Sequence, residues 1–221
     1  AAVTVGMIAF QNQKLNRELT TELDGLTRGE LGKMAQSVYL MCRAQQEAVE
    51  SKVRSDLNVA REILQDVGEV EFSDESATWS AVNQNTKATQ SIELPKMTVG
   101  GTWLGQNTSL SERSPIVDKV KDLVGGTCTI FQRMNEAGDM LRVCTNVEKT
   151  DNTRAIGTYI PAVNPDGTPN PVIAATLKGQ VYTGRAFVVN DWYITAYEPI
   201  RDKAGQIAGL PAVLFRLRPR R

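Results

Sequence analysis

The feature that most constrains the fold is a long segment without proline, from Met7 to about Val67, in which apolar residues recur at helical spacing. Steps of three and four residues place these side chains on one stripe of an α-helix, while Lys52 and Glu62 lie opposite it. At ~1.5 Å per residue such a helix would be ~90 Å long, more than a compact domain needs. The stripe consists of Leu15, Leu19, Leu23, Leu26, Met34, Val38, Met41, Val49, Val53, Leu57, Ala60, Leu64 and Val67.

After Val67 the pattern changes to short runs with period-two alternation and β-branched residues, which predict strands within 69–73, 79–86 and 87–101. The segment 114–126 predicts a short amphipathic helix, because Pro115 follows Ser114 and a pair of glycines ends the apolar pattern.

Two hairpins and a closing strand complete the pattern. The first hairpin spans 127–147 with its turn at Asn135 to Gly138, and the second spans 177–200 with its turn at Asn190-Asp191. The last strand covers 207–215. We therefore predict an α+β fold, in which a long N-terminal helix packs on a five-stranded antiparallel sheet with a small additional N-terminal strand region.

The segment 152–179, between the hairpins, is rich in proline and glycine and ends in a short apolar helix. Long loops within compact domains usually serve function, and we expect this one to cover the sheet as a lid.

Composition argues against several function classes. The chain has no histidine, which removes the commonest general base and metal ligand, and its 25 basic residues balance 25 acidic ones. Cys42, Cys128 and Cys144 show none of the short paired spacings of metal or redox sites. We expect no enzyme activity, cofactor, metal or nucleic-acid partner.

The first ten residues carry no charge and precede a polar stretch. They are too short to span a bilayer, and they fit either the outer end of a membrane helix or an ordinary apolar helix start.

Several segments together resemble the Cache family, specifically the fused Cache3 and Cache2 sensor modules of methyl-accepting chemotaxis proteins. The resemblance covers about residues 80 to 209 and is carried by IELPKMTVGGTWLGQN, GGTCTIFQRMNEAGDMLRVCTNV, RAIGTYIP, NPDGTPNPVI and LKGQVYTGRAFVVNDWYITAYEPIRDKAGQIAG.

The resemblance implies a PAS-like sheet carried on a long helix, with flanking membrane helices and a cytoplasmic signalling region. The domain would then lie in the periplasm as part of an inner-membrane receptor, and a homodimer through the long helix is expected. Residues 1–69 would form the membrane-proximal helix and 70–221 the ligand-binding module of one structural domain.

Two departures from the family pattern stand out. Pro211 lies inside the expected last strand, so that strand should be bulged, at an edge or ended early. A hairpin turn centred on Glu136 would place Cys128 opposite Cys144, and these residues form either a disulfide or two buried thiols.

The second hairpin offers a candidate ligand face. With Asn190-Asp191 as a two-residue turn, small residues at 184, 186 and 188 face the hydroxyl groups of Tyr193, Thr195 and Tyr197. The other face, which carries Arg185, is expected to pack against a helix.

Arg142 is the expected ligand anchor. It should share a face with Ile130 and Met140, where a guanidinium needs an anionic partner such as a carboxylate. Each assignment has a competing interpretation. Arg142 pairs instead with Glu148 or Asp151 at the surface. Separately, Tyr193 and Tyr197 are core residues whose hydroxyl groups find local partners.

The related citrate and fumarate sensor kinases are similar in pattern, which implies ligand positions at Arg142, Thr145, Thr195 and Tyr197. Those relatives carry a second basic group where Thr195 stands here, so a small, singly charged acid is expected. Tyr159 could close over the pocket from the loop, and Arg133 and Arg154 are further candidates.

Three functions remain open. The first is a chemoreceptor sensor for a small organic acid such as acetate. The second is the same sensor on a histidine kinase or a cyclic-nucleotide enzyme. The third, a soluble carboxylate-processing enzyme, is disfavoured by the absence of histidine.

Overall fold

The computed structural model describes residues 2–189 and 191–216, and the side chains of 13–189 and 191–215. Its contacts divide the chain into one unit that ends at Ala48 and a second that begins at Val49. Helix α1 (Ala2–Val67) thus contributes its last turns to the second unit. Among the described residues, no helix has a stretch long and apolar enough to cross a membrane.

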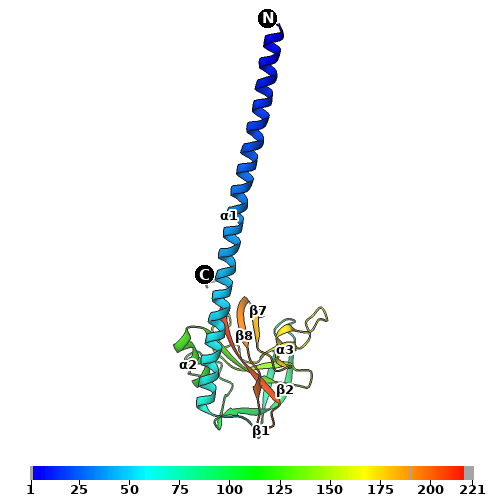
Figure 1. Ribbon diagram of the computed structural model, residues 1–221. Helices are drawn as coiled ribbons and strands as arrows, with labels where there is room; N and C mark the ends of the chain where they lie inside the picture. Colours follow the sequence, from blue (N-terminus) through cyan, green and yellow to red (C-terminus); the bar gives the residue numbers. More distant parts are fainter. Residues whose placement is uncertain (1, 190, 217–221) are drawn as a thin grey trace. The chain divides into compact units, whose positions relative to one another are not determined.

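The second unit contains all the other elements (Figure 1). The short helices are α2 (Pro115–Val124) and α3 (Pro171–Thr176). The strands are β1 (Val70–Asn83), β2 (Thr89–Val99), β3 (Thr102–Trp103), β4 (Thr127–Arg133), β5 (Met140–Thr145), β6 (Thr158–Ile160), β7 (Tyr182–Val188), β8 (Asp191–Tyr197), β9 (Ile200–Arg201) and β10 (Ile207–Arg216).

The predicted α+β class is confirmed, but the sheet is larger than five strands. The five predicted strands are neighbours in the order β5-β4-β10-β8-β7, and all their pairings are antiparallel. Beyond β5 the same sheet continues through β6, β1, β2 and β3 to make ten strands with β9. The pairing of β1 with β6 is parallel, so the sheet is mixed. Local patterns indicated β1, as two separate runs, and β2, but not that they join the same sheet. The short strands β3, β6 and β9 were not predicted, and β6 lies within the expected loop 152–179.

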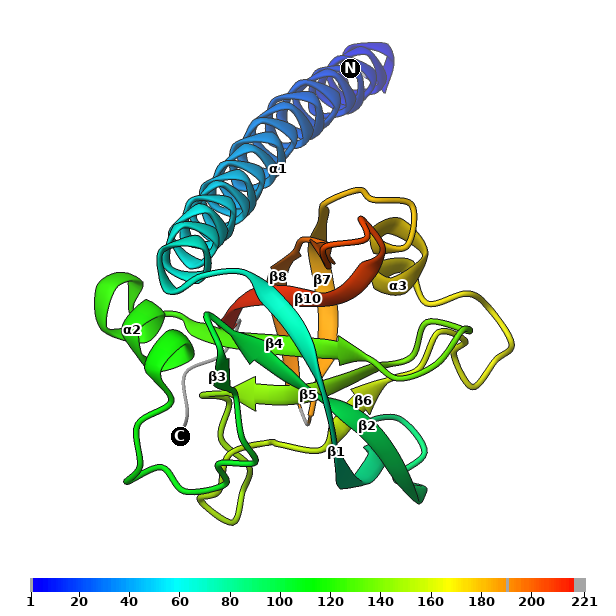
Figure 2. The same ribbon diagram turned by 90° about the horizontal axis from the view of Figure 1, so that it is seen from below.

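Two apolar clusters cover the two faces of the sheet. The first contains Val53, Leu57 and Ala60 of α1 together with Val117 and Val120 of α2. The second contains residues of α3, which Figure 2 shows away from α1 and α2. Ile130 belongs to the first cluster and Phe131 to the second, and successive residues of a strand point to opposite sides, so the two clusters lie on opposite faces. We call these the α1 cluster and the α3 cluster.

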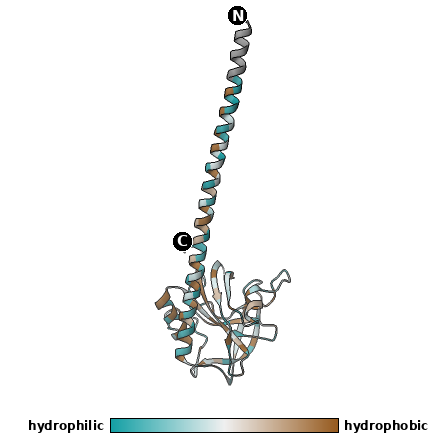
Figure 3. Cartoon of the chain, in the orientation of Figure 1, coloured by the Kyte–Doolittle hydropathy of each residue, from teal (hydrophilic) through white to brown (hydrophobic). Residues whose placement is uncertain are grey.

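The apolar stripe of α1 is used in two ways. From Val53 to Leu64 it is buried in the α1 cluster. From Leu15 to Met41 its large side chains are exposed, and Figure 3 shows brown residues recurring along this part of the helix. Propensity and periodicity therefore predicted the helix, while its packing differs between the two parts.

Pro211 lies inside β10, which is neither an edge strand nor ended early. β10 pairs with β4 on one side and β8 on the other, and Pro211 faces Ile130 in regular register. The oxygen of Pro211 accepts a hydrogen bond from Glu198 N, just beyond the end of β8. Since N–H and C=O of one residue point to the same side of an antiparallel strand, the missing N–H falls where no ladder bond is required.

The β4–β5 hairpin contains a bulge that the sequence did not indicate. Ile130 lies opposite Cys144 but Phe131 lies opposite Arg142, so Val143 is the extra residue. The predicted opposition of Cys128 and Cys144 is therefore wrong, and both are buried free thiols. The bulge also turns Arg142 and Cys144 to different faces, so the expectation that Arg142 shares a face with Ile130 is wrong.

Candidate functional site

Two arginines, Arg142 and Arg154, are among the largest fully buried side chains of the described chain. Burying a guanidinium is costly unless acceptors replace the water that it loses. The partners of each arginine therefore show whether it belongs to the scaffold or to a site.

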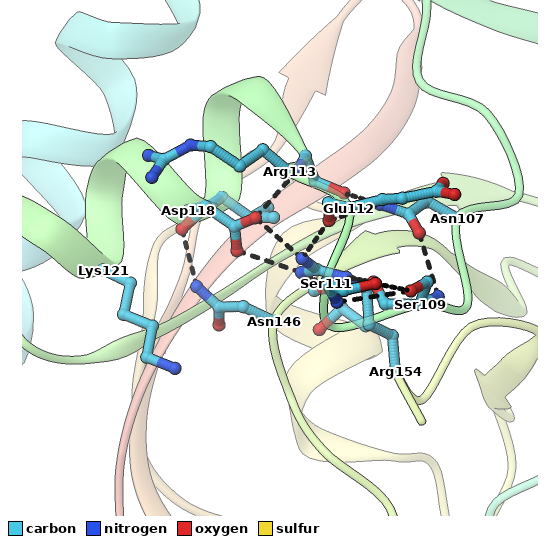
Figure 4. A network of polar contacts seen from close by, with 12 residues as sticks. Asn107, Ser109, Ser111, Glu112, Arg113, Asp118, Lys121, Asn146 and Arg154 are labelled. Carbon is cyan, nitrogen blue, oxygen red and sulfur yellow. Dashed lines mark hydrogen bonds and ion pairs between the residues drawn. The ribbon is translucent and has the colours of Figure 1, made fainter. Parts of the chain in front are cut away.

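All the N–H groups of Arg154 have acceptors (Figure 4). Its guanidinium donates to both carboxylate oxygens of Asp118, at 3.0 and 2.8 Å. It also donates to the backbone oxygens of Ser109, Glu112 and Thr145, at distances of 2.7 to 2.9 Å. Arg154 thus ties α2 and the loop before it to the end of β5, and it is a structural residue.

Asp118 receives a further hydrogen bond from Ser114 N, at 2.8 Å, just before α2 begins. Burial by itself would raise the pKa of Asp118, but the hydrogen bonds and charge of Arg154 outweigh it and hold the pKa below its ordinary value. The pair is therefore ionised at neutral pH.

Arg142 has far fewer partners. Its Nη1 donates to Thr158 Oγ1, and its Nε and Nη2 have no hydrogen-bond partner in the described part of the chain. No carboxylate among the described residues forms an ion pair with it, so the expected alternative pairing with Glu148 or Asp151 is not observed. Its guanidinium carbon lies 5.0 Å from the centre of the Phe131 ring, in the α3 cluster.

The buried Arg142 remains charged. Burial lowers the pKa of Arg142 to about 10, and the neighbouring Tyr197 and Tyr193 oppose that shift. At neutral pH the side chain is therefore a cation with free N–H donors in an apolar region, which is a suitable partner for an anion.

Tyr193, Thr195 and Tyr197 lie on the same face of β8 as expected, and all three are buried. The register of the hairpin differs from the prediction, because Gly184 lies opposite Thr195 and Ala186 opposite Tyr193. Asn190 of the predicted turn lies outside the described residues. A shift of two residues preserves which residues share a face, so the predicted grouping survives the wrong register.

The hydroxyl groups of β8 differ in their partners. Thr195 Oγ1 donates to the oxygen of Gly184, at 3.0 Å. The Tyr197 hydroxyl is buried without a partner among the described residues, and burial raises the pKa of Tyr197 to about 12. Tyr197 therefore offers a neutral O–H beside the Arg142 cation.

The remaining predicted residues are placed differently. Thr145 is fully buried and bonds to Thr129, 2.6 Å between hydroxyl oxygens, and accepts from Val147 N. Tyr159 lies in the α1 cluster, where its hydroxyl accepts from Asn83. The structure does not bring Tyr159 to the Arg142 side of the sheet. Arg133 donates to backbone oxygens of its own hairpin turn.

A pocket of about 220 Å³ lies next to Tyr197, and of the predicted ligand residues Tyr197 lines it while Arg142, Tyr193 and Thr195 do not. Tyr197 and Ala186 line it from the β7–β8 hairpin, and Asn170 and Val172 line it from α3 and the loop before it. The long loop thus forms one wall of the pocket, in agreement with its expected covering role. Tyr197 is the residue that both lines the pocket and neighbours Arg142.

Gln84, which the sequence did not single out, is a further pocket residue. It follows β1, is 5% exposed, and its Oε1 has no partner within the described chain. Gln84 lies within the predicted strand 79–86, and no feature of that segment marked it as a ligand residue. Trp79 Nε1 also lacks a partner there, but Trp79 belongs to the α1 cluster.

The comparisons with known proteins agree with this architecture. The sequence profile described as the Cache 3/Cache 2 fusion domain matches residues 16–216, which is most of the chain. A search of curated proteins found no match. Cache domains are extracytoplasmic sensor modules and are not catalytic. The match spans most of α1 and the complete sheet, and the chain belongs to the Cache 3/Cache 2 fusion domain family.

Proposed function

We propose that this sensor domain binds a small organic acid, an acetate-like carboxylate, and that Arg142 is its anchor. The observation that carries the proposal is the state of Arg142, a fully buried cation with N–H groups that have no acceptor in the described chain. A carboxylate would supply both the missing charge and the missing acceptors.

The tyrosines of β8 support an anionic ligand. The Tyr197 hydroxyl is a buried donor without a partner in the described chain, and it lies next to Arg142. Tyr193 and Thr195 share its face. We propose that Tyr197 donates to the ligand directly, that Tyr193 and Thr195 shape the floor, and that Thr145 fixes the strand beside Arg142.

The size of the pocket supports a small ligand. Pockets for drug-sized molecules typically measure about 300 to 1,000 Å³, and this one is about 220 Å³. Because Arg142 is the single buried cation among the described residues of the site, a monocarboxylate is preferred over a di- or tricarboxylate.

We further propose that the domain belongs to a transmembrane chemoreceptor. Ligand binding under the wall formed by α3 would favour one of two arrangements of the sheet against α1, and α1 would pass that change toward the membrane. The same domain on a histidine kinase or a cyclic-nucleotide enzyme would use the same binding step.

Calorimetry and thermal unfolding with acetate and propionate test the binding proposal, with acetamide as the uncharged control. A ligand at a hundred times its Kd stabilises by about 2.7 kcal/mol, which corresponds to a rise in Tm of roughly 5 to 10 °C. Acetamide should give no shift. If no short acid raises the Tm, the carboxylate proposal is wrong.

Tyrosine variants test the site itself. Tyr197→Phe should weaken acid binding about tenfold or more, because it removes a hydrogen bond to a charged group. Tyr182→Phe is the matched control, because its hydroxyl already donates to the oxygen of Arg185. Equal affinities of the two variants would remove Tyr197 from the site.

The exposed part of the α1 stripe is proposed to pair with α1 of a second copy. Leu19, Leu23 and Leu26 are 48 to 68% exposed at helical spacing, and the stripe from Leu15 to Met41 is linear and would complement itself. Sedimentation equilibrium should show a dimer that Leu23→Glu with Leu26→Glu dissociates. Arg28→Glu, on the opposite face, should leave it intact, and a wild-type monomer at all concentrations would refute the pairing.

A further inference from the structure

We infer that the ligand is a short hydroxy acid and that Gln84 binds its hydroxyl group. This inference rests on the proposed carboxylate function and adds the second recognition element of the same pocket. It starts from the side-chain amide of Gln84, which is buried in the pocket wall with an oxygen that no described residue satisfies.

An unsatisfied buried amide oxygen is unfavourable, because its bond to water is lost and nothing replaces it. No described neighbour donates a hydrogen bond to Gln84 Oε1. Asn170 caps α3 by accepting from Val172 N, and its amide nitrogen donates to Asn164 at 3.2 Å. Gln84 is thus a pocket amide whose acceptor is left for a ligand.

The sheet places Gln84 and Arg142 within reach of one small molecule. Gln84 N donates to the oxygen of Tyr159, which places Gln84 beside the end of β6, and Arg142 bonds to Thr158 of the same strand. Val82 lies opposite Thr158, so Gln84 is two residues farther along and on the same face. Because β6 lies between β1 and β5, the two residues are offset by two strand spacings, roughly 10 Å, and by two residues along the strands, roughly 6 to 7 Å. Their Cα atoms are thus about 12 Å apart, and the two long side chains narrow that gap toward the length of a short acid.

Charge decides between a hydroxyl and an ammonium group as the donor. Among the described residues that line the pocket there is no aspartate or glutamate, and the charged side chain is the cation Arg185. An ammonium group buried there would have no counter-charge, whereas a hydroxyl needs only a neutral acceptor. A hydroxyl also accepts hydrogen bonds, so it can pair with either end of the Gln84 amide.

Propionate, lactate and alanine form a matched series for the test, because they differ at one carbon in carrying hydrogen, hydroxyl or ammonium. Calorimetric titration should rank lactate first, with propionate about tenfold weaker for the loss of one buried hydrogen bond. Alanine should bind more weakly than propionate.

Variants of Gln84 separate its role from general pocket effects. Gln84→Met should abolish the preference for lactate over propionate, so that the two acids bind with equal affinity. Gln84→Glu should raise the affinity for alanine relative to lactate, because it adds the missing counter-charge. Gln90→Met, an exposed exchange of the same kind on β2, should change neither affinity.

The outcomes distinguish the two proposals. Equal binding of lactate and propionate, or a lactate preference that survives in Gln84→Met, overturns the hydroxy-acid inference and leaves the carboxylate site standing. Failure of all three acids and of acetate to bind overturns the carboxylate site as well.

Discussion

Asp118 and Arg154 form a bidentate ion pair in which the two N–H···O distances are 3.0 and 2.8 Å, and the arginine side chain is 2% exposed. The pair joins α2 to the loop after β5, and Arg154 also donates to the oxygen of Thr145 at the end of β5, the strand that carries Arg142. Substitution of the two buried arginines should therefore change the free energy of unfolding in opposite directions.

Substitution of Arg154 should be strongly destabilising. Arg154→Met leaves the partly buried Asp118 carboxylate without its cation. It also removes the N–H groups that donate to three backbone oxygens. The expected loss is about 3 to 5 kcal/mol in the free energy of unfolding, measured by urea denaturation. A loss below that of an ordinary surface substitution would show that the network is not structural.

Substitution of Arg142 should have the opposite effect in the absence of ligand. Arg142→Met removes a buried cation whose Nε and Nη2 have no partners among the described residues, and Thr158 keeps its own bond to the oxygen of Ala155. Unfolding free energy should rise by about 1 to 3 kcal/mol, while binding of short acids is lost. Arg142→Met that unfolds like Arg154→Met would mean that Arg142 holds the core together and is not reserved for a ligand.

Stability should fall in acid through Asp118. Its pKa in the folded protein is lower than the ordinary value, so its contribution is complete above the unfolded pKa of about 3.9 and is lost as pH falls through the folded value. The free energy of unfolding should therefore decrease as pH falls below about 5. Asp118→Asn should be less stable at pH 7 and less sensitive to acid, and an unchanged acid profile in this variant would contradict the assignment.

The cysteines should differ in reactivity. Cys42 is exposed, whereas Cys128 and Cys144 are buried. Burial raises the pKa of Cys144 to about 12 and also raises that of Cys128, so little thiolate forms at either. The native protein should react with one equivalent of a thiol reagent at pH 8, and the unfolded protein without reductant should react with three. One equivalent after unfolding would reveal a disulfide.

The sequence alone determined the helices, the two hairpins and the closing strand, and it identified several residues near the site, but it did not indicate β3, β6 or β9. The stripe of α1, the segment 114–126 and the alternation in both hairpins were sufficient, because helix and strand periodicity is a local property. The grouping of Tyr193, Thr195 and Tyr197 was also predictable, since a register error of two residues does not change the face.

Tertiary structure decided the remaining features. Val143 forms a bulge, so Arg142 points to the α3 cluster and away from Ile130. No local sequence pattern predicted this bulge. The sequence cannot distinguish the roles of Arg142 and Arg154. The fold provides Arg154 with hydrogen bonds to Asp118 and to three backbone oxygens. The parallel pairing of β1 with β6 places Gln84 in the pocket. Each of these outcomes depends on contacts between residues far apart in the chain, and such contacts determine which buried polar groups find partners.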